Sequence, residues 1–499
     1  MILSLALKRA AIITGLFAPL NLVAESLAED PSSIQNKVTN KAGKDAKPWV
    51  DKSGKELQSW AKENLHRKLI GKKVIKDEDH PEWAWFRKSG LGIFLHWGLA
   101  SVPPNNGDAW AMVWNERRSR MNELIKPEAM FAVADHWSPE SYDPNKWMEA
   151  AAKAGFGYSV LTTRHHDGYC LWPSEYGEWD TGEKMGGRDL LKDYVEACRN
   201  NDIRVGLYYS GPNWHFSYKL KDFSHPPKSY NYLHEKHEEG KTPLVPIMGG
   251  GKLPAELAKA EKAESTGQVT ELLTKYGSID MLWWDGNSIM TEEEVHKIQP
   301  NTFVARGNIA TPEGLGQGAS NNVKVTNEAG WWWEMCAKAE NHHTPNWHYN
   351  ERNEEPELHW DTNTLLSELI RCRSLGGNLL VNITPRPNGE MMDIYYKICN
   401  EMAEWMKHSK EAIYDVQLTA PLPTLDKTEN FTTVKGSTWY SLPNDKGMIE
   451  IKDIPAVTSV TLLRTGAVLD HTFDNGVLNV TVPKELQTAT PDLVKITFK

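Results

Sequence analysis

The chain has 499 residues, 40% hydrophobic and 24% charged, a balance typical of a soluble globular protein with more than one domain. Its formal net charge of −10 argues against nucleic acid or an anionic membrane surface as the main partner. The five cysteines are widely spaced, without metal-binding spacing or a dense disulfide framework, and are expected to be small buried residues.

The N-terminus has the pattern of an export signal. Lys8 and Arg9 precede an apolar stretch that ends before Ala24, a small residue at a plausible cleavage point. The stretch is short and interrupted for a membrane span, so export to the periplasm or outside the cell is favoured over an uncleaved anchor. We therefore predict a signal peptide over 1–24, no membrane span in the mature chain, and a polar leader over 25–80.

Short apolar runs alternate with amphipathic helices between residues 81 and 414. Near-continuous apolar character is typical of strands covered on both faces. The predicted strands cover residues 90–98, 158–168, 203–211, 278–286, 302–308 and 376–383. One helix is expected to end at Gly155, and another to begin with a capping box formed by Thr291 and Glu294. The alternation predicts a (β/α)-barrel, TIM-like catalytic domain over 81–414. A doubly wound open sheet is less favoured because no glycine-rich phosphate turn is present.

The pattern changes again after residue 414. Helical periodicity stops, and Leu478, Val480 and Val482 occupy alternate positions after an Asp474-Asn475-Gly476 turn. We predict a small antiparallel β-sandwich over 415–499.

Five successive predicted strands end in polar or ionisable side chains. These residues are His96, then His165 and His166, then Tyr208, then Asp285, then Arg306. In a (β/α)-barrel the carboxyl ends of the strands carry the active site. An aspartate before a glycine is by itself more often a turn residue or a cap, but the whole set favours a functional site.

The residue types at the strand ends fit two kinds of chemistry. Metal binding on one strand needs two histidines that point the same way. His165 and His166 are adjacent, so on a regular strand they would point to opposite faces, and both could face the cleft only at a bulge or at the strand end. Sugar hydrolysis needs a carboxylate nucleophile and a second carboxyl group. Asp285 fits the first role, and the neighbouring Trp283 and Trp284 offer flat apolar faces to a sugar.

Five motifs together resemble the α-L-fucosidases of glycoside hydrolase family 29. They cover roughly residues 82–413, in the order "WFRKSGLGIFLHWGLASVP", "LTTRHHDGYCLW", "GLYYSG", "YGSIDMLWWDG" and "GGNLLVNITP". The resemblance implies a (β/α)-type barrel, a C-terminal β-sandwich, and a retaining two-step mechanism without a metal or other cofactor.

The resemblance also implies roles for individual residues. Asp285 matches the nucleophile, and side chains that bind the fucose hydroxyls match His96, His165, His166 and Tyr208, with Arg306 as a further match. A Glu-Trp pair that lines the sugar pocket in the family is only half present, because Ala109 precedes Trp110, and Trp110 alone is carried over. We also expect Trp284 or its neighbour Trp283 to line the niche for the sugar methyl group.

The acid/base is matched less directly. Glu313 in "RGNIATPEG" corresponds to a Thr-Pro-Glu-like segment of many relatives, with Glu328 as the rival and Glu334 as a third candidate. The prediction is an exported retaining exo-α-L-fucosidase acting on a fucosylated glycan. The alternatives are a non-catalytic fucose-binding relative and a metal-dependent hydrolase.

Overall fold

The computed structural model describes residues 80–103, 109, 113–114, 127–219, 231–232, 255–305, 313–314, 332–339, 347–417 and 430–498. The predicted signal peptide (1–24) lies outside these residues, as does all of the predicted leader (25–80) except His80. Among the described residues, no helix combines the length and apolar composition needed to cross a bilayer.

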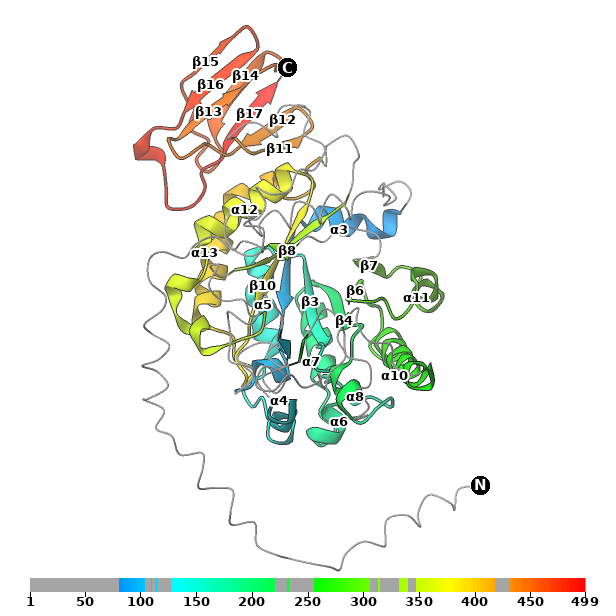
Figure 1. Ribbon diagram of the computed structural model, residues 1–499. Helices are drawn as coiled ribbons and strands as arrows, with labels where there is room; N and C mark the ends of the chain where they lie inside the picture. Colours follow the sequence, from blue (N-terminus) through cyan, green and yellow to red (C-terminus); the bar gives the residue numbers. More distant parts are fainter. Residues whose placement is uncertain are drawn as a thin grey trace, which may run out of the picture. The chain divides into compact units, whose positions relative to one another are not determined.

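Eight parallel strands form the main sheet (Figure 1). They are β1 (Leu91–Leu95), β3 (Tyr158–Arg164), β4 (Arg204–Ser210), β6 (Met281–Asp285), β7 (Phe303–Ala305), β8 (Glu313–Gly314), β9 (Glu334–Lys338) and β10 (Asn378–Ile383). The strand order is β7-β6-β4-β3-β1-β10-β9-β8. All six predicted strands are present, whereas β8 and β9 were not predicted.

The strand order shows that the sheet curls into a barrel-like form. Apart from β7 and β8, successive strands of this sheet pair with each other, and the last strand, β10, pairs with the first, β1, from Leu91 opposite Leu379 to Leu95 opposite Ile383. A doubly wound sheet would reverse its strand order partway, and this one does not. The described residues contain no pairing between β7 and β8, the two edges of the sheet.

Helices alternate with these strands along the chain. They are α3 (Ala84–Ser89), α4 (Pro127–Ala132), α5 (Pro144–Ala154), α6 (Thr181–Lys184), α7 (Leu190–Asn200), α8 (Trp214–Lys219), α10 (Ala255–Thr274), α11 (Glu292–Ile298), α12 (Thr362–Ser374) and α13 (Asp393–Ser409). The expected helix signals are confirmed. Gly155 ends α5 in the left-handed conformation, and Thr291 and Glu294 form the capping box of α11.

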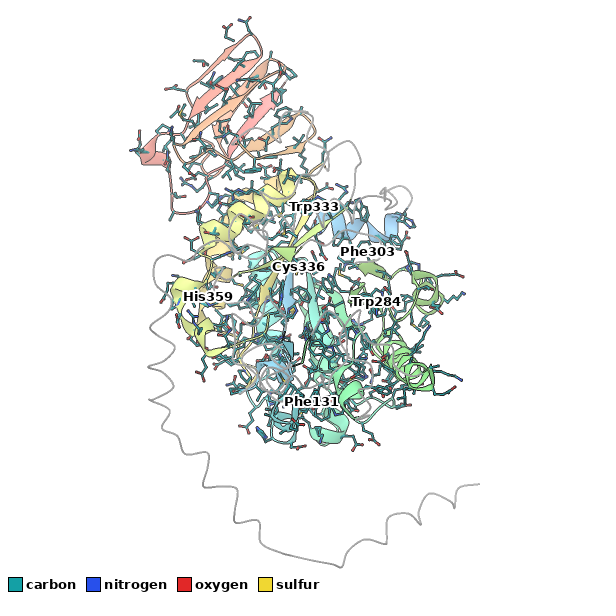
Figure 2. The ribbon with its side chains drawn as sticks, in the orientation of Figure 1. Phe131, Trp284, Phe303, Trp333, Cys336 and His359 are labelled. Carbon is teal, nitrogen blue, oxygen red and sulfur yellow. The ribbon has the colours of Figure 1, made fainter. Side chains whose placement is uncertain are left out.

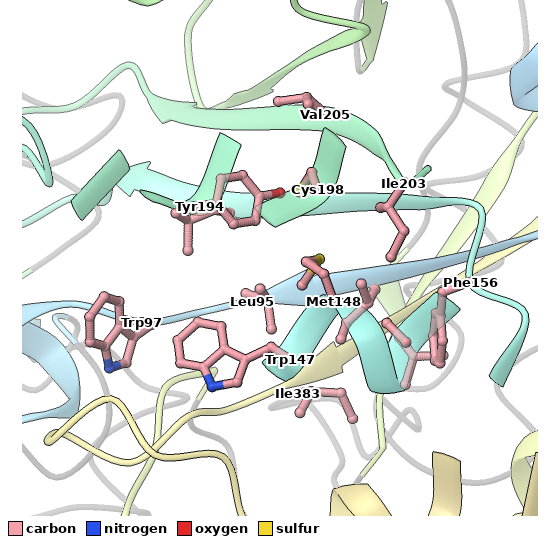
Figure 3. Packing of buried hydrophobic residues seen from close by; sticks show 14 of the residues in the cluster. Leu95, Trp97, Trp147, Met148, Phe156, Tyr194, Cys198, Ile203, Val205 and Ile383 are labelled. Carbon is pink, nitrogen blue, oxygen red and sulfur yellow. The ribbon is translucent and has the colours of Figure 1, made fainter. Parts of the chain in front are cut away.

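Two apolar layers lie on opposite faces of the sheet because successive strand residues point to opposite sides. The outer layer packs the sheet against the helices, as Figure 3 shows for Leu95 and Val205 of the sheet with Met148 of α5 and Tyr194 of α7. A second cluster fills the barrel interior. Its strand members are Phe94, Tyr158, Val160, Tyr208, Met281, Trp283, Phe303, Ala305, Cys336 and Leu380. All five cysteines are buried free thiols, as expected.

The C-terminal residues form two antiparallel sheets. Their strands are β11 (Thr432–Lys435), β12 (Thr438–Ser441), β13 (Met448–Ile451), β14 (Val457–Leu462), β15 (His471–Asp474), β16 (Val477–Thr481) and β17 (Val494–Phe498). The sheets have the orders β11-β12-β17-β14 and β13-β16-β15 and contribute side chains to one shared hydrophobic cluster. Asn475 and Gly476, both with positive φ, make the predicted tight turn between β15 and β16. A minor pair, β2 (Val113–Trp114) with β5 (Asn231–Tyr232), completes the described strands.

Candidate active site

Asp285 ends β6, and its carboxylate is held by side chains of the neighbouring strands. The Tyr208 hydroxyl donates to Asp285 Oδ2 at 2.7 Å, and His166 Nε2 lies 3.4 Å from the same oxygen. The side chain of Asp285 is 22% exposed, whereas that of His166 is 3% exposed. Thr291, and not Asp285, caps the helix that follows. The geometry is therefore that of a positioned, partly accessible carboxylate at the carboxyl end of a barrel strand.

A β-bulge in β3 explains how both adjacent histidines reach this carboxylate. Thr162 pairs with Tyr208, but Arg164 pairs with the next residue, Tyr209, so Thr163 is the extra residue. The bulge sends Arg164 to the helix side and His165 to the interior, where the His165 ring stacks on Tyr208 with centroids 5.6 Å apart. His166 follows beyond the strand end, and its ring centroid lies 4.4 Å from that of His165.

The hydroxyl of Ser210 determines which nitrogen of His166 carries a proton. Ser210 Oγ donates its single hydrogen to the carbonyl oxygen of Pro212 at 3.0 Å. It must therefore accept from His166 Nδ1, which lies 2.6 Å away. The Nε2 atom is then the one that faces Asp285, and protonation there makes His166 an imidazolium paired with the carboxylate.

Arg164 supports the same chain of contacts from the helix side. Its guanidinium is fully buried and donates to Pro212 O at 3.2 Å, to Gln268 Oε1 of α10 at 3.0 Å, and to the Tyr209 hydroxyl. The carbonyl oxygen of Pro212 therefore accepts hydrogen bonds from both Arg164 and Ser210. This fixes the segment after β4 on which the orientation of His166 depends.

His96 lies at the end of β1 in a fully buried setting. Its Nδ1 lies 2.5 Å from Asn382 Oδ1, and its ring contacts those of His165, Tyr208 and His348. Burial lowers the pKa of His96 well below its usual range, and the charge of His348 adds to this effect, while the Asn382 contact and Asp285 oppose it. His96 is therefore a neutral hydrogen-bonding side chain near neutral pH.

Several residues at the same end of the sheet were not predicted from the sequence. Lys338 ends β9, is 1% exposed, and pairs in register with Asn382 of β10. The Trp347 ring is only partly buried and lies 5.2 Å from that of His96, and His348 beside it is fully buried. The aromatic and histidine cluster in "NWHYN" was the available signal for the last two. Lys338 had no such signal because its strand was missed.

The placement of Trp284 corrects the prediction that this residue lines the sugar pocket. Trp284, labelled in Figure 2, is 2% exposed and belongs to the outer layer. Leu272 of α10 and Val295 of α11 belong to the same layer. Strand alternation instead puts Trp283 on the same side as Asp285. The Trp283 ring stacks on Tyr208 at 5.4 Å, and its Nε1 donates to Glu334 at 2.9 Å.

The three acid/base candidates are described to different extents. The backbone of Glu313 lies in β8, opposite Cys336 of β9. Glu334 is fully buried at the amino end of β9, and its two carboxylate oxygens accept from Trp283 and from Tyr158. It lies about 13 Å along the strand from the carboxyl end, which argues against proton transfer there. Glu328 lies outside the described residues, as do the predicted site residues Arg306 and Trp110.

Comparisons with known proteins show the family to which the chain belongs. The family model described as Alpha-L-fucosidase matches residues 59–411. The tissue alpha-L-fucosidase of Bos taurus is 27% identical over 376 residues, which cover 73% of this chain and 73% of the bovine protein.

Solved structures extend the likeness to the fold. Alpha-L-fucosidase isoenzyme 1 from Paenibacillus thiaminolyticus superposes with a TM-score of 0.64 at 25% identity, covering 84% of this chain and 99% of that one. The Thermotoga maritima alpha-fucosidase in complex with fucose superposes with a TM-score of 0.60 at 25% identity, covering 83% of this chain and 96% of that one. The chain therefore belongs to the alpha-L-fucosidases of glycoside hydrolase family 29 and is a glycoside hydrolase.

Proposed function

We propose that the protein is an exported, retaining exo-α-L-fucosidase in which Asp285 is the nucleophile and Glu313 is the acid/base. The observation that carries the proposal is the carboxylate of Asp285, held at a strand end by Tyr208 at 2.7 Å and His166 at 3.4 Å. The fucose complex of the Thermotoga maritima protein supports terminal fucose as the group that is recognised.

The proposed reaction has two steps. Asp285 attacks the anomeric carbon of a terminal α-L-fucose, the glycosidic C–O bond breaks, and Glu313 protonates the departing oxygen. Water then attacks the glycosyl-enzyme, Glu313 takes its proton, and the bond to Asp285 breaks. In the free enzyme the carboxylate accepts a hydrogen bond from Tyr208 and faces His166 Nε2. His96 and His165, together with Arg306 and Trp110, complete the proposed fucose-binding set.

Replacing Asp285 tests the nucleophile. Asp285→Ala is expected to lose at least about a thousandfold in kcat/KM on an aryl α-L-fucoside, because the covalent route disappears. Azide is then expected to restore part of the turnover and to give a fucosyl azide of inverted configuration. Retention of near-normal turnover by this variant would refute the assignment.

Replacing the glutamates tests the acid/base. Glu313→Gln is expected to spare substrates with activated aryl leaving groups in the first step but to slow poor leaving groups strongly. The glycosyl-enzyme then accumulates, and azide relieves it with retained configuration. Glu328→Gln is the matched control. The same pattern at Glu328, with wild-type behaviour at Glu313, would reassign the role.

Two broader features belong to the same proposal. Closure of the sheet into a complete (β/α)-barrel is supported by the pairing of β10 with β1, and a β-sandwich by the shared core of the C-terminal sheets. Export is supported by the signal-like pattern of residues 1–24. Hydrolysis that persists in EDTA is the expected result for a mechanism without metal, and loss of hydrolysis in EDTA would favour a metal-dependent hydrolase.

A further inference from the structure

Three side chains at the strand ends form a group with metal-ligand chemistry. One nitrogen from each of His165 and His166 and one oxygen of Asp285 all lie within 4.8 Å of one another. Within this group, His166 Nε2 and Asp285 Oδ2 are 3.4 Å apart. Zinc bonds of about 2.0–2.1 Å in a tetrahedral site place neighbouring ligand atoms about 3.3 Å apart.

His166 already has the hydrogen bond that metal-bound histidines usually make. Its Nδ1 donates to Ser210 Oγ at 2.6 Å, and Ser210 in turn donates to Pro212 O. Such an outer contact fixes the tautomer and aims the other nitrogen at the ion. Here Nε2 is the nitrogen that faces Asp285. When Nε2 carries no proton, its lone pair points towards the space between His165, His166 and Asp285, where a cation would bind.

The surroundings favour a borderline cation over a hard one. His165 and His166 are both buried, and two more buried histidines, His96 and His348, lie in ring contact with His165 at 5.7 and 4.6 Å. Imidazole nitrogen suits Zn²⁺, Cu²⁺ and Ni²⁺, whereas Mg²⁺ and Ca²⁺ prefer sites built from oxygen. Asp285 supplies one negative charge to a site that is otherwise neutral or basic.

We propose that His165, His166 and Asp285 form a reversible inhibitory site for a borderline divalent cation such as Zn²⁺. The cation binds the carboxylate that is proposed to attack the sugar, and so competes with the terminal fucose. The inhibitory part of this inference rests on the proposed function, whereas the binding part rests on the three side chains alone.

Direct binding is measured first, without substrate. The full chain, freed of metal with EDTA and then of EDTA, is titrated with ZnCl₂ by calorimetry, with MgCl₂ in parallel. We expect the wild type to bind zinc at one site. His165→Ala and His166→Ala should each lower the zinc affinity at least tenfold, and L-fucose should also lower it. Mg²⁺ is expected not to bind at this site. The control is His471→Ala, an exposed residue of β15 in the C-terminal sheets, which is expected to bind zinc as the wild type does.

Inhibition is measured second, with an aryl α-L-fucoside. Zinc is expected to raise KM without lowering kcat, and EDTA to restore the activity. Wild-type zinc affinity in both histidine variants, or no zinc binding at all, would overturn the site. Faster turnover with zinc would overturn its inhibitory character. If Asp285→Ala keeps its hydrolytic activity while the histidine variants lose zinc, the proposed function fails and the cation site stands.

Discussion

Replacing Tyr208 by phenylalanine isolates one hydrogen bond to the proposed nucleophile. The Tyr208 hydroxyl donates to Asp285 at 2.7 Å, while its ring stacks between His165 and Trp283 at 5.6 and 5.4 Å. Phenylalanine keeps both stacking contacts and removes only the donor. A hydrogen bond to a charged group contributes about 1.5–3 kcal/mol, which corresponds to a loss of about 10- to 150-fold in kcat/KM if the bond matters for the reaction.

The adjacent tyrosine provides a matched control. Tyr209 points to the opposite face of β4, where its hydroxyl donates to Gln268 at 2.8 Å and accepts from Arg164. Tyr209→Phe is therefore expected to lower the free energy of unfolding by about 1–3 kcal/mol, and to lower kcat/KM of the folded protein much less than Tyr208→Phe does, because its hydroxyl does not contact Asp285. Both variants are assayed with an aryl α-L-fucoside and by thermal unfolding.

The reasoning fails on either of two results. A loss below about threefold for Tyr208→Phe would mean that the hydrogen bond seen in the structure does not act on the reaction. A loss equal to that of Asp285→Ala would mean that Tyr208 does more than donate one hydrogen bond.

The other predictions concern groups around the site. Ser210→Ala leaves His166 Nδ1 without its acceptor and is expected to lower kcat/KM about tenfold; an unchanged value would remove Ser210 from the positioning network. Glu334→Gln disturbs the contact with Trp283 and is expected to destabilise the fold by about 1–3 kcal/mol. Any loss in activity should be the same for good and poor leaving groups, whereas the loss of an acid/base would slow poor leaving groups more. Burial raises the pKa of Glu261 from an ordinary value of 4.5 to about 7. The free energy of unfolding therefore falls as pH rises from the pKa of the unfolded chain towards that of the folded protein. Glu261→Gln should therefore unfold like the wild type at pH 4 but be more stable by roughly 1–2 kcal/mol at pH 8; equal stability at both would contradict the shift.

The strands that the sequence predicted correctly are those whose apolar runs are continuous. Residues 281–284 of β6 are all buried apolar side chains, and such a run needs no tertiary information to be recognised. β9 was missed because its five residues, from Glu334 to Lys338, begin and end with charged side chains. Those charges face the barrel interior, where Glu334 is satisfied by partners from two other strands. Contacts between residues so far apart in sequence leave no local pattern.

The candidate site was predictable where it depends on strand ends, and unpredictable where it depends on register. His166, Tyr208 and Asp285 each lie at or near the end of an apolar run, and the structure brings them together. The choice between Trp283 and Trp284 depends on which face β6 turns inward. A strand with apolar residues on both faces does not reveal this, and the prediction of Trp284 was therefore wrong.

The bulge in β3 makes the number of residues between Thr162 and His165 decisive, because that number determines which face of the sheet each following side chain occupies. Inserting one further residue between Thr162 and His165 would shift the alternation by one position, bringing the Arg164 guanidinium into the apolar interior and turning His165 towards the helices, whereas deleting the extra residue would leave both side chains on their present faces. Both misplaced groups would be buried without their partners, a cost that no single substitution nearby would match. Loop exchange among relatives is therefore expected to succeed only with junctions after Gly168, beyond the two histidines, and any engineered insertion upstream would have to add residues in pairs.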